Sequence, residues 1–130
     1  MKRVLIVEPK AADAQALKKS LRDVGLLNAA TVMKTGAEAR THLEARDRDS
    51  VVFLNIHSPD GDGMMFLDWL REQRFHKDML VVAVGERTQL RTVVEACERG
   101  AHTFLIKPVH VEDLKNLART HPNHWERAEQ

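Results

Sequence analysis

The sequence has little cysteine, no long hydrophobic run and almost no net charge. Its single cysteine, Cys97, excludes an internal disulfide and fits a reducing compartment. No stretch approaches the ~18 consecutive apolar residues that a membrane-spanning helix requires. The net charge is +1 and the basic residues are scattered among acidic ones, so no basic stripe is available to a nucleic acid or a membrane surface. These absences predict a cytoplasmic domain without nucleic-acid or membrane partners.

The sequence also lacks internal repeats, low-complexity segments and the glycine-rich loops that bind phosphate in nucleotide-binding proteins. Its 130 residues, of which 43% are hydrophobic, suit one globular domain with a single core. The basic start and the apolar residues after it superficially resemble a signal peptide, but the apolar run is short and ends at the charged Glu8. We therefore expect one domain over residues 1–120, followed at 121–130 by a tail or the start of a linker.

What is present is an alternation of apolar runs with amphipathic segments. The short apolar runs predict strands at 3–7, 28–33, 51–54, 79–84 and 103–106. After each run, apolar residues recur at three- and four-residue steps, which is typical of helices that cover one side of a sheet. Strands that alternate with helices pair in parallel through right-handed crossovers. The sequence thus predicts an α/β fold, a doubly wound parallel sheet with helices on both faces.

The apolar run 51–54 leads into Asn55, and the chain is organised around this point. In open α/β sheets the chemistry lies beyond the carboxyl ends of the strands, so Asn55 occupies the place where function is expected. Ser58, Asp60 and Asp62 follow in a loop rich in proline and glycine. Such a loop is typical of turns and helix caps, so these side chains are poor candidates for catalysis.

Three pieces of the sequence carry a resemblance to a known family. They are the apolar run that ends at Glu8, the stretch from Asn55 to Gly63, and the stretch from Gly100 to Pro108 with its glycine-alanine, aromatic and lysine-proline signals in order. Together they resemble the bacterial response-regulator receiver domain over almost the whole chain. The resemblance implies a flavodoxin-like (βα)5 fold with strand order 2-1-3-4-5.

The resemblance also implies a chemistry, which is self-phosphorylation of an aspartate at the end of the third strand. Mg²⁺, held by that aspartate and by an acidic pair after the first strand, assists the transfer in this family. A serine or threonine on the fourth strand and a lysine on the fifth hold the phosphoryl group, and an aromatic residue on the fifth strand follows the hydroxyl inward.

This sequence departs from the family pattern at three places. Asn55 replaces the aspartate, Glu8-Pro9 replaces the acidic pair, and Gly85 replaces the hydroxyl. The lysine and the aromatic residue are retained. The resemblance therefore implies a degenerate phosphorylation pocket, which comprises Glu8, Pro9, Asn55, Gly85, Phe104 and Lys107.

The chemistry of this pocket predicts that it is silent. An amide is a far weaker nucleophile than a carboxylate and does not form an acyl phosphate, so Asn55 is not an acceptor. The family's site carries a charge of about −2, whereas Glu8 and Lys107 sum to zero, so Mg²⁺ binding should be lost or weak. We therefore expect no catalytic residue, no metal site, no cofactor and no enzymatic activity. Glu8 should form a salt bridge with Lys107 instead of holding a metal.

Two alternatives remain open at this point. In the first, Asn55 is a single Asp→Asn change in an otherwise conventional receiver, although Gly85 and the proline after Glu8 degrade the same site independently. In the second, the emptied pocket around Asn55, Gly85 and Lys107 senses a small ligand. His121 and His124 could share a metal, but no third ligand is near in sequence, and a solvated tail is expected there.

The leading prediction is a phosphorylation-independent protein-interaction module in a bacterial two-component-type pathway. As the resemblance implies, a protein partner, an effector domain or a second copy of the chain would bind the face formed by the fourth helix, fifth strand and fifth helix. The candidate contact residues, each of which could also belong to an ordinary solvated surface, are Arg87, Leu90, Arg91, Arg99, His102, Phe104 and Lys115. Gly85 should leave space that lets Phe104 rest inward and locks the domain in one state.

Overall fold

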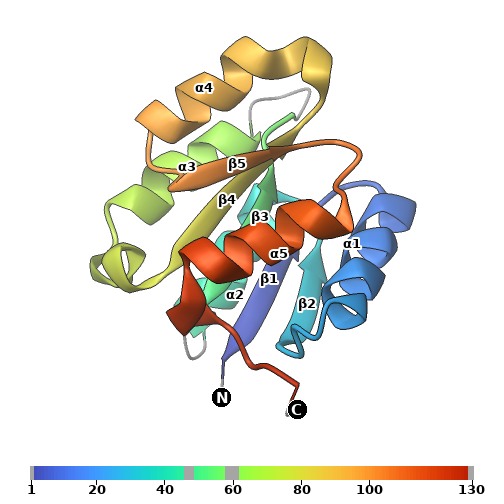
Figure 1. Ribbon diagram of the computed structural model, residues 1–130. Coiled ribbons are helices and arrows are strands. Elements are labelled where there is room, and N and C mark those ends of the chain that lie inside the picture. The colour runs from blue at the N-terminus through green and yellow to red at the C-terminus, as the bar shows by residue number, and fades with distance from the viewer. Residues whose placement is uncertain (1, 46–48, 58–61, 129–130) are drawn as a thin grey trace.

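A parallel sheet runs through the centre of the molecule and carries helices on both faces (Figure 1). The computed structural model describes residues 2–45, 49–57 and 62–128. In this part of the chain five strands are ordered β2-β1-β3-β4-β5, which confirms the predicted flavodoxin-like fold. The strands are β1 (Arg3–Val7), β2 (Ala29–Met33), β3 (Val51–Asn55), β4 (Leu80–Gly85) and β5 (Thr103–Ile106).

The helices follow the strands along the chain. The α-helices are α1 (Ala11–Asp23), α2 (Gly36–Ala45), α3 (Asp62–Arg71), α4 (Leu90–Glu98) and α5 (Val111–Thr120). Short 3₁₀ helices are η1 (Arg74–Asp78), η2 (Arg87–Gln89) and η3 (Pro122–His124). Helices α1 and α5 cover one face of the sheet, and α2, α3 and α4 cover the other. Among the residues that the structure describes, no helix combines the length and the hydrophobicity needed to cross a membrane.

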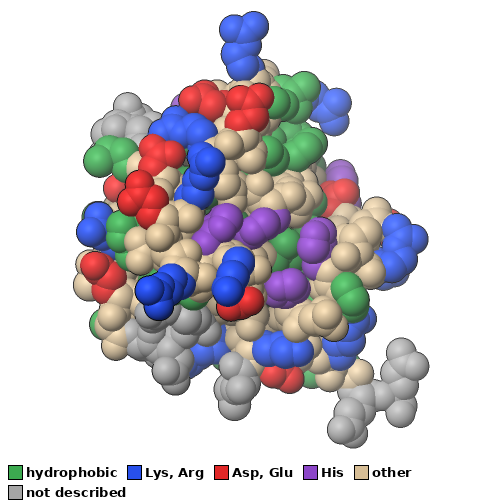
Figure 2. All heavy atoms as spheres, turned by 90° about the vertical axis from the view of Figure 1, so that its left-hand side faces the viewer, with side chains coloured by type: hydrophobic (Ala, Val, Ile, Leu, Met, Phe, Trp, Pro, Cys, Tyr) green, Lys and Arg blue, Asp and Glu red, His purple; other side chains and the backbone are tan. Residues whose placement is uncertain are grey.

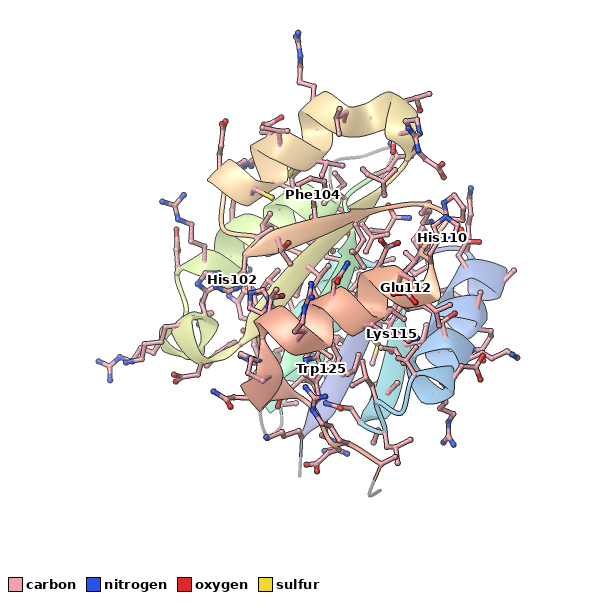
Figure 3. All side chains as sticks on the ribbon, viewed as in Figure 1. His102, Phe104, His110, Glu112, Lys115 and Trp125 are labelled. Carbon is pink, nitrogen blue, oxygen red and sulfur yellow. The ribbon has the colours of Figure 1, made fainter. Side chains whose placement is uncertain are left out.

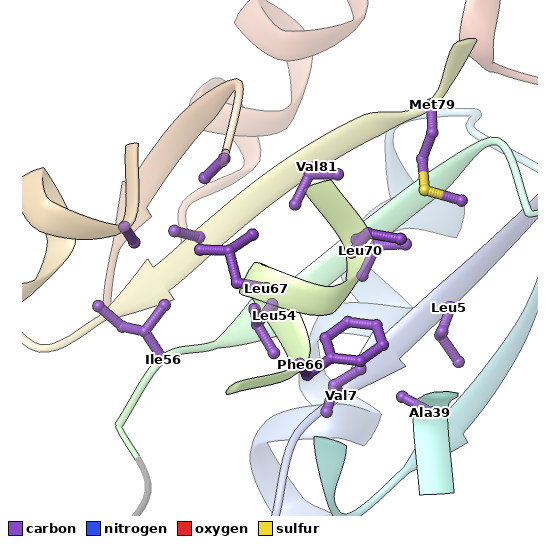
Figure 4. Close-up of a cluster of buried hydrophobic side chains, with 14 of the residues drawn as sticks. Leu5, Val7, Ala39, Leu54, Ile56, Phe66, Leu67, Leu70, Met79 and Val81 are labelled. Atoms are coloured by element: carbon purple, nitrogen blue, oxygen red, sulfur yellow. The ribbon is translucent and has the colours of Figure 1, made fainter. Parts of the chain in front are cut away.

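The central strands are apolar throughout because both of their faces are covered. Successive side chains of a strand point to opposite faces. On β3, Val52 and Leu54 pack under α2 and α3, and Phe53 points toward α1 and α5. Figure 4 shows Leu67 and its neighbours on α3 packed against the buried side chains on the face of the sheet that α2, α3 and α4 cover, Leu54 among them. This burial fixes the sheet, so that the carboxyl ends of β1, β3 and β5 are brought together at one edge.

Asp62 has a structural role at that edge. Its carboxylate accepts hydrogen bonds from the backbone N–H groups of Gly36 and Ala37, and so caps the N-terminus of α2. A side chain on Gly36 would not fit, because its Cβ would lie 2.6 Å from the Asp62 carboxylate. Asp62 thus caps α2 and not the helix that follows its own loop, whereas Ser58 and Asp60 lie outside the described residues.

Asp49 connects the segment before β3 to helix α2. The side chain of Asp49 is buried, and its Oδ2 lies 2.9 Å from Nε2 of His42 on α2. The pair ties the end of α2 to the start of β3, and the imidazole offers a polar partner that the sequence pattern did not identify.

Residues 121–128 pack against the domain, where a solvated tail was expected. Trp125 is 3% exposed, its ring lies 6.3 Å from that of Phe53, and its Nε1 donates to the carbonyl of His121 at 2.9 Å. Figure 3 shows Trp125 beneath α5. The indole therefore closes one end of the core between the sheet and α5.

The backbone on either side of Trp125 is also held. The Asn28 side chain donates to the carbonyl of His124 and accepts from the N–H of Glu126, at 3.1 and 2.8 Å. Arg127 then forms an antiparallel bridge with Leu26. These contacts make residues 121–128 part of the folded unit.

Replacing Trp125 with alanine should destabilise the domain by about 3–5 kcal/mol, the usual cost of removing a buried aromatic ring. Chemical denaturation of Trp125→Ala and of Trp125→Phe, which keeps a ring in the cavity, measures the effect. Phenylalanine should recover most of the loss. A loss below about 1 kcal/mol in the alanine variant would show that the segment only rests on the surface.

Candidate functional site

Glu8 is the centre of the candidate site. It follows β1, is 6% exposed, and its backbone N–H donates to the carbonyl of Met33, which continues the pairing of β1 with β2. Asn55 Nδ2 lies 3.0 Å from each of its carboxylate oxygens, and Lys107 Nζ lies 2.7 Å from Oε1. The backbone N–H of Lys10 donates to the other oxygen at 3.1 Å. A buried carboxylate needs such donors, and both oxygens of Glu8 have them.

Lys107 follows β5 and reaches two carboxylates. The bond to Glu8 confirms the predicted salt bridge, and a second bond of 2.8 Å to Asp13 Oδ2 was not predicted. Burial disfavours the charged ammonium, but the hydrogen bonds to Asp13 and Glu8 outweigh it, so the pKa of Lys107 lies above its usual value. The hydrogen bond from Lys107 in turn holds the pKa of Asp13 below its usual range. Lys107 and Asp13 are therefore both charged at neutral pH.

Asn55 is oriented by hydrogen bonds on both sides of its amide. Its Nδ2 faces Glu8, and its Oδ1 accepts from the backbone N–H of His57 at 2.8 Å. The side of the amide that faces the pocket is therefore a donor. An aspartate in this orientation would present an oxygen to the Glu8 carboxylate instead.

The family's metal can be tested against this donor set. Mg²⁺ prefers octahedral oxygen ligands, usually carboxylates and water. Pro9 offers no side-chain oxygen, and the oxygens of Glu8 are taken by Asn55 and Lys107. No group of three or more His, Cys, Asp or Glu side chains in the described residues is arranged to hold a metal ion. The residues present therefore do not fit Mg²⁺.

Asp13 changes the charge expected for the pocket. Glu8 and Lys107 alone would leave it neutral, but the second carboxylate on the same ammonium gives a charge of −1. A cavity of about 420 Å³ begins at this pocket. Asn55 and Lys107 line it, and Gly85 does not. The small-ligand pocket predicted around all three residues thus includes two of them.

The prediction that Gly85 leaves room for Phe104 is wrong. A Cβ added to Gly85 would lie 2.8 Å from Val93 Cγ2, so a side chain of α4 already occupies that space. Phe104 lies on the outer side of β5 and is 42% exposed (Figure 3). Val93 of α4, and not the ring of Phe104, thus lies beside Gly85.

Comparison with known proteins decides the family. Residues 4–119 match the family model of the response regulator receiver domain. The chain belongs to this family. The match ends just before the segment that carries Trp125.

Individual relatives of this receiver are distant. It is 25% identical to the transcriptional regulatory protein KdpE of Staphylococcus aureus over 118 residues, which cover 90% of this chain and 48% of KdpE. A receiver domain from Methylobacillus flagellatus has a similar structure with a TM-score of 0.76 and 27% identity, covering 92% of this chain and 98% of that one. The bacteriophytochrome response regulator RtBRR has a TM-score of 0.82 and 22% identity, and the match covers all of this chain and 83% of RtBRR. The receiver spans about half the length of KdpE and less of the rice response regulators that it matches.

The predicted contact residues of this receiver differ in whether their side chains form ion pairs. Arg99 is paired with Asp68 on α3 and with Glu95, and Lys115 is paired with Glu112. Arg99 therefore ties α4 to α3. Among the predicted contact residues, Arg87 and Arg91 are exposed and form no ion pair within the described residues. The apolar Leu90 and Phe104 are exposed as well.

The imidazole of His102, just before β5, is held by a hydrogen bond and by a stacked ring. Its Nδ1 accepts from the backbone N–H of Val81 at 2.9 Å, and its ring stacks on that of His76 with centroids 4.6 Å apart. Figure 2 shows histidine side chains gathered on this side of the molecule. Desolvation and then the neighbouring imidazole of His76 lower the pKa of His102. The accepting nitrogen also requires the neutral ring.

Replacing Asn55 with aspartate should cost about 1–3 kcal/mol of stability at neutral pH without divalent cations, because two carboxylates would face each other across 3.0 Å. The cost should shrink toward acidic pH, where the pair shares a proton. Urea denaturation measures it. Asn116→Asp, at an exposed position where the side chain accepts from Arg119, is the matched control and should be near neutral. An Asn55→Asp variant as stable as the parent would contradict the network described for Glu8.

Acidification should weaken the fold through His102. Because the pKa of His102 is lowered, the unfolded chain takes up a proton at a pH where the folded chain does not. The contribution is complete above about pH 6.5 and is lost as the pH falls below it. Denaturation of the parent and of His102→Asn, whose amide oxygen can accept from Val81 without titrating, isolates the effect. The parent should lose more stability than His102→Asn between about pH 7 and pH 5.5, and equal losses would count against this assignment.

Proposed function

We propose that this receiver is a phosphorylation-independent protein-interaction module in a two-component-type pathway. The observation that carries the proposal is the closed network of Glu8, Asn55 and Lys107. The acceptor position holds an amide that donates to a buried carboxylate. An amide does not form the acyl phosphate on which the family's signal depends, so the site has no nucleophile in the required place.

Loss of metal chemistry is the second part of the proposal. A divalent cation would have to displace Asn55 and Lys107 from Glu8, and Pro9 supplies no second carboxylate. Without the cation, a transferring phosphoryl group would lose most of its charge stabilisation. The domain would therefore need no cofactor and would catalyse no phosphoryl transfer.

The third part concerns the signal itself. With no hydroxyl on Gly85 and with Val93 in the space beside it, phosphate has no side chain to draw toward the pocket. Phe104 remains outward, at 42% exposure, and is available to a partner. A partner can shift a conformational equilibrium only through its own differential affinity for two states. Recognition would thus depend on the presence of the partner and not on a covalent mark.

The partner surface is the α4–β5–α5 face, by which we mean the outward side chains of these three elements (Figures 1 and 3). It carries most of the large hydrophobic side chains that are exposed in the described residues, namely Leu90, Val94, Phe104 and Val111, each 42–51% exposed. Exposed apolar side chains that gather on one face mark interaction sites. We propose a cytoplasmic protein partner, an effector domain of the same polypeptide or a second copy of the chain as the occupant.

The main alternative is a conventional receiver with a single Asp→Asn change. Restoring aspartate at position 55 would still leave Pro9 without a carboxylate and Val93 against Gly85. The alternative therefore requires that one substitution recover phosphorylation, and the proposal requires that it not do so.

Incubation with acetyl phosphate and Mg²⁺ should give no phosphoryl mass increment on the intact chain, and none on Asn55→Asp. The reason is that the intact chain has no carboxylate at position 55, whereas Asn55→Asp still lacks the second acidic side chain after β1, where Pro9 stands. A phosphorylatable receiver in the same buffer is the positive control. Labelling of the unaltered chain would refute the proposal, and labelling of Asn55→Asp alone would establish the single-change alternative.

Capture of host proteins by the immobilised chain should be unaffected by acetyl phosphate and by Asn55→Ala, and should be lost in Phe104→Asp. An aspartate at position 104 would place a charge that is costly to desolvate on the α4–β5–α5 face, whereas Asn55 ends β3 and is not part of that face. Quantitative mass spectrometry compares the captured sets. Met65→Asp, which places the same charge on an exposed apolar residue of α3, is the control. Dependence on acetyl phosphate, or equal loss in both aspartate variants, would contradict the proposal.

A further inference from the structure

A cavity of about 420 Å³ opens beside the degenerate pocket, on the face of the sheet that α1 and α5 cover. Its size lies within the range typical of small-molecule sites. The cavity extends from the carboxyl ends of the strands to the middle of α1, so only one of its ends coincides with the pocket described above.

The floor and one wall of the cavity are apolar. Ile6, Phe53 and Val84 line it from neighbouring strands. From α1, Leu17 and the small residues Ala16 and Ser20 line it at spacings that share one side of a helix. The small side chains on α1 are what leave the space open. Such a floor suits the hydrocarbon part of a ligand.

The mouth of the cavity is acidic. Glu8, Asp13 and Lys107 lie together there and carry a combined charge of −1. Lys10 and Glu86, which are exposed and also line the cavity, cancel each other and leave this charge unchanged.

Of Glu8, Asp13 and Lys107, the three side chains at the mouth, Asp13 has capacity left for a ligand. Lys107 donates to its Oδ2, and its Oδ1 accepts no hydrogen bond from the described residues. Glu8 is already satisfied by Asn55 and Lys107. An acceptor that stays charged and lies at the mouth of an apolar cavity selects a hydrogen-bond donor that bears a positive charge.

We propose that this cavity binds a small amphipathic amine, with its ammonium group on Asp13 and its hydrocarbon part on the strand floor between β1, β3 and β4. A carboxylate head would meet the negative mouth and be disfavoured, and a hydroxyl head would gain only a neutral hydrogen bond. This inference goes beyond the interaction function proposed above, because the cavity would take such a ligand whether or not the domain is phosphorylated.

The test uses three probes that differ only in the head group, which are hexylamine, hexanol and hexanoate. Titration of the isotope-labelled chain by NMR at constant pH and ionic strength gives an affinity for each and locates the site through the shifted amides. Hexylamine should bind about tenfold more tightly than hexanol, as expected for one partly screened ion pair, and hexanoate most weakly. The shifted amides should lie on α1, at the carboxyl ends of β1, β3 and β4, and in the segment after β5.

Variants separate the two parts of the site. Asp13→Asn should abolish the preference for hexylamine over hexanol, and Asp23→Asn, which removes the same charge from an exposed position on α1, should leave it intact. Ser20→Leu should fill the cavity and weaken all three probes, with its folding checked by thermal unfolding. Equal affinity for the three probes, a preference for hexanoate, or shifts confined to other surfaces would overturn the proposal. None of these results bears on acetyl phosphate labelling, so the two proposals fail independently.

Discussion

The salt bridge between Glu8 and Lys107, with Asn55 as a second donor to the same carboxylate, is the interaction on which the character of this receiver depends. A carboxylate that is 6% exposed is stable only if its oxygens are paired, since an isolated buried charge is costly. The family satisfies this requirement with a metal ion that also serves phosphoryl transfer. Here protein donors satisfy it, and they are present in the resting fold. The same contacts occupy the carboxylate oxygens that a cation would otherwise bind.

The fold supplies the rest of the arrangement. Parallel strands β1, β3 and β5 end at one edge, so residues 47 and 99 positions from Glu8 come within hydrogen-bond distance of it. Helix α1 then adds Asp13, which binds the second side of Lys107. On the opposite face, Val93 fills the space beside Gly85, and the output residue Phe104 stays outward. Glu8 and Gly85 are thus each packed against neighbouring side chains of the resting fold.

Much of this could be predicted from the sequence, because it depended on local signals. Apolar runs and their turn residues located all five strands. The resemblance to the receiver family implied the strand order and brought Glu8 and Lys107 to one edge of the sheet, where their pairing was predicted. What was missed depends on contacts between distant segments. Asp13 precedes the apolar Leu17 by one helical turn, a spacing that could have placed it over the sheet edge. Nothing local indicates that Val93 would fill the space at Gly85, or that Trp125 would dock on Phe53.

The central claim is that Glu8 is held by Asn55 and Lys107 and is therefore closed to a metal ion and a phosphoryl group. The side-chain amide protons of Asn55 report on this bond directly. Their NMR signals should remain at one position when Mg²⁺ and beryllium fluoride, which imitates a bound phosphoryl group, are added in large excess. A saturable shift of these signals would mean that Glu8 releases Asn55 to take up the cation, and would contradict the account.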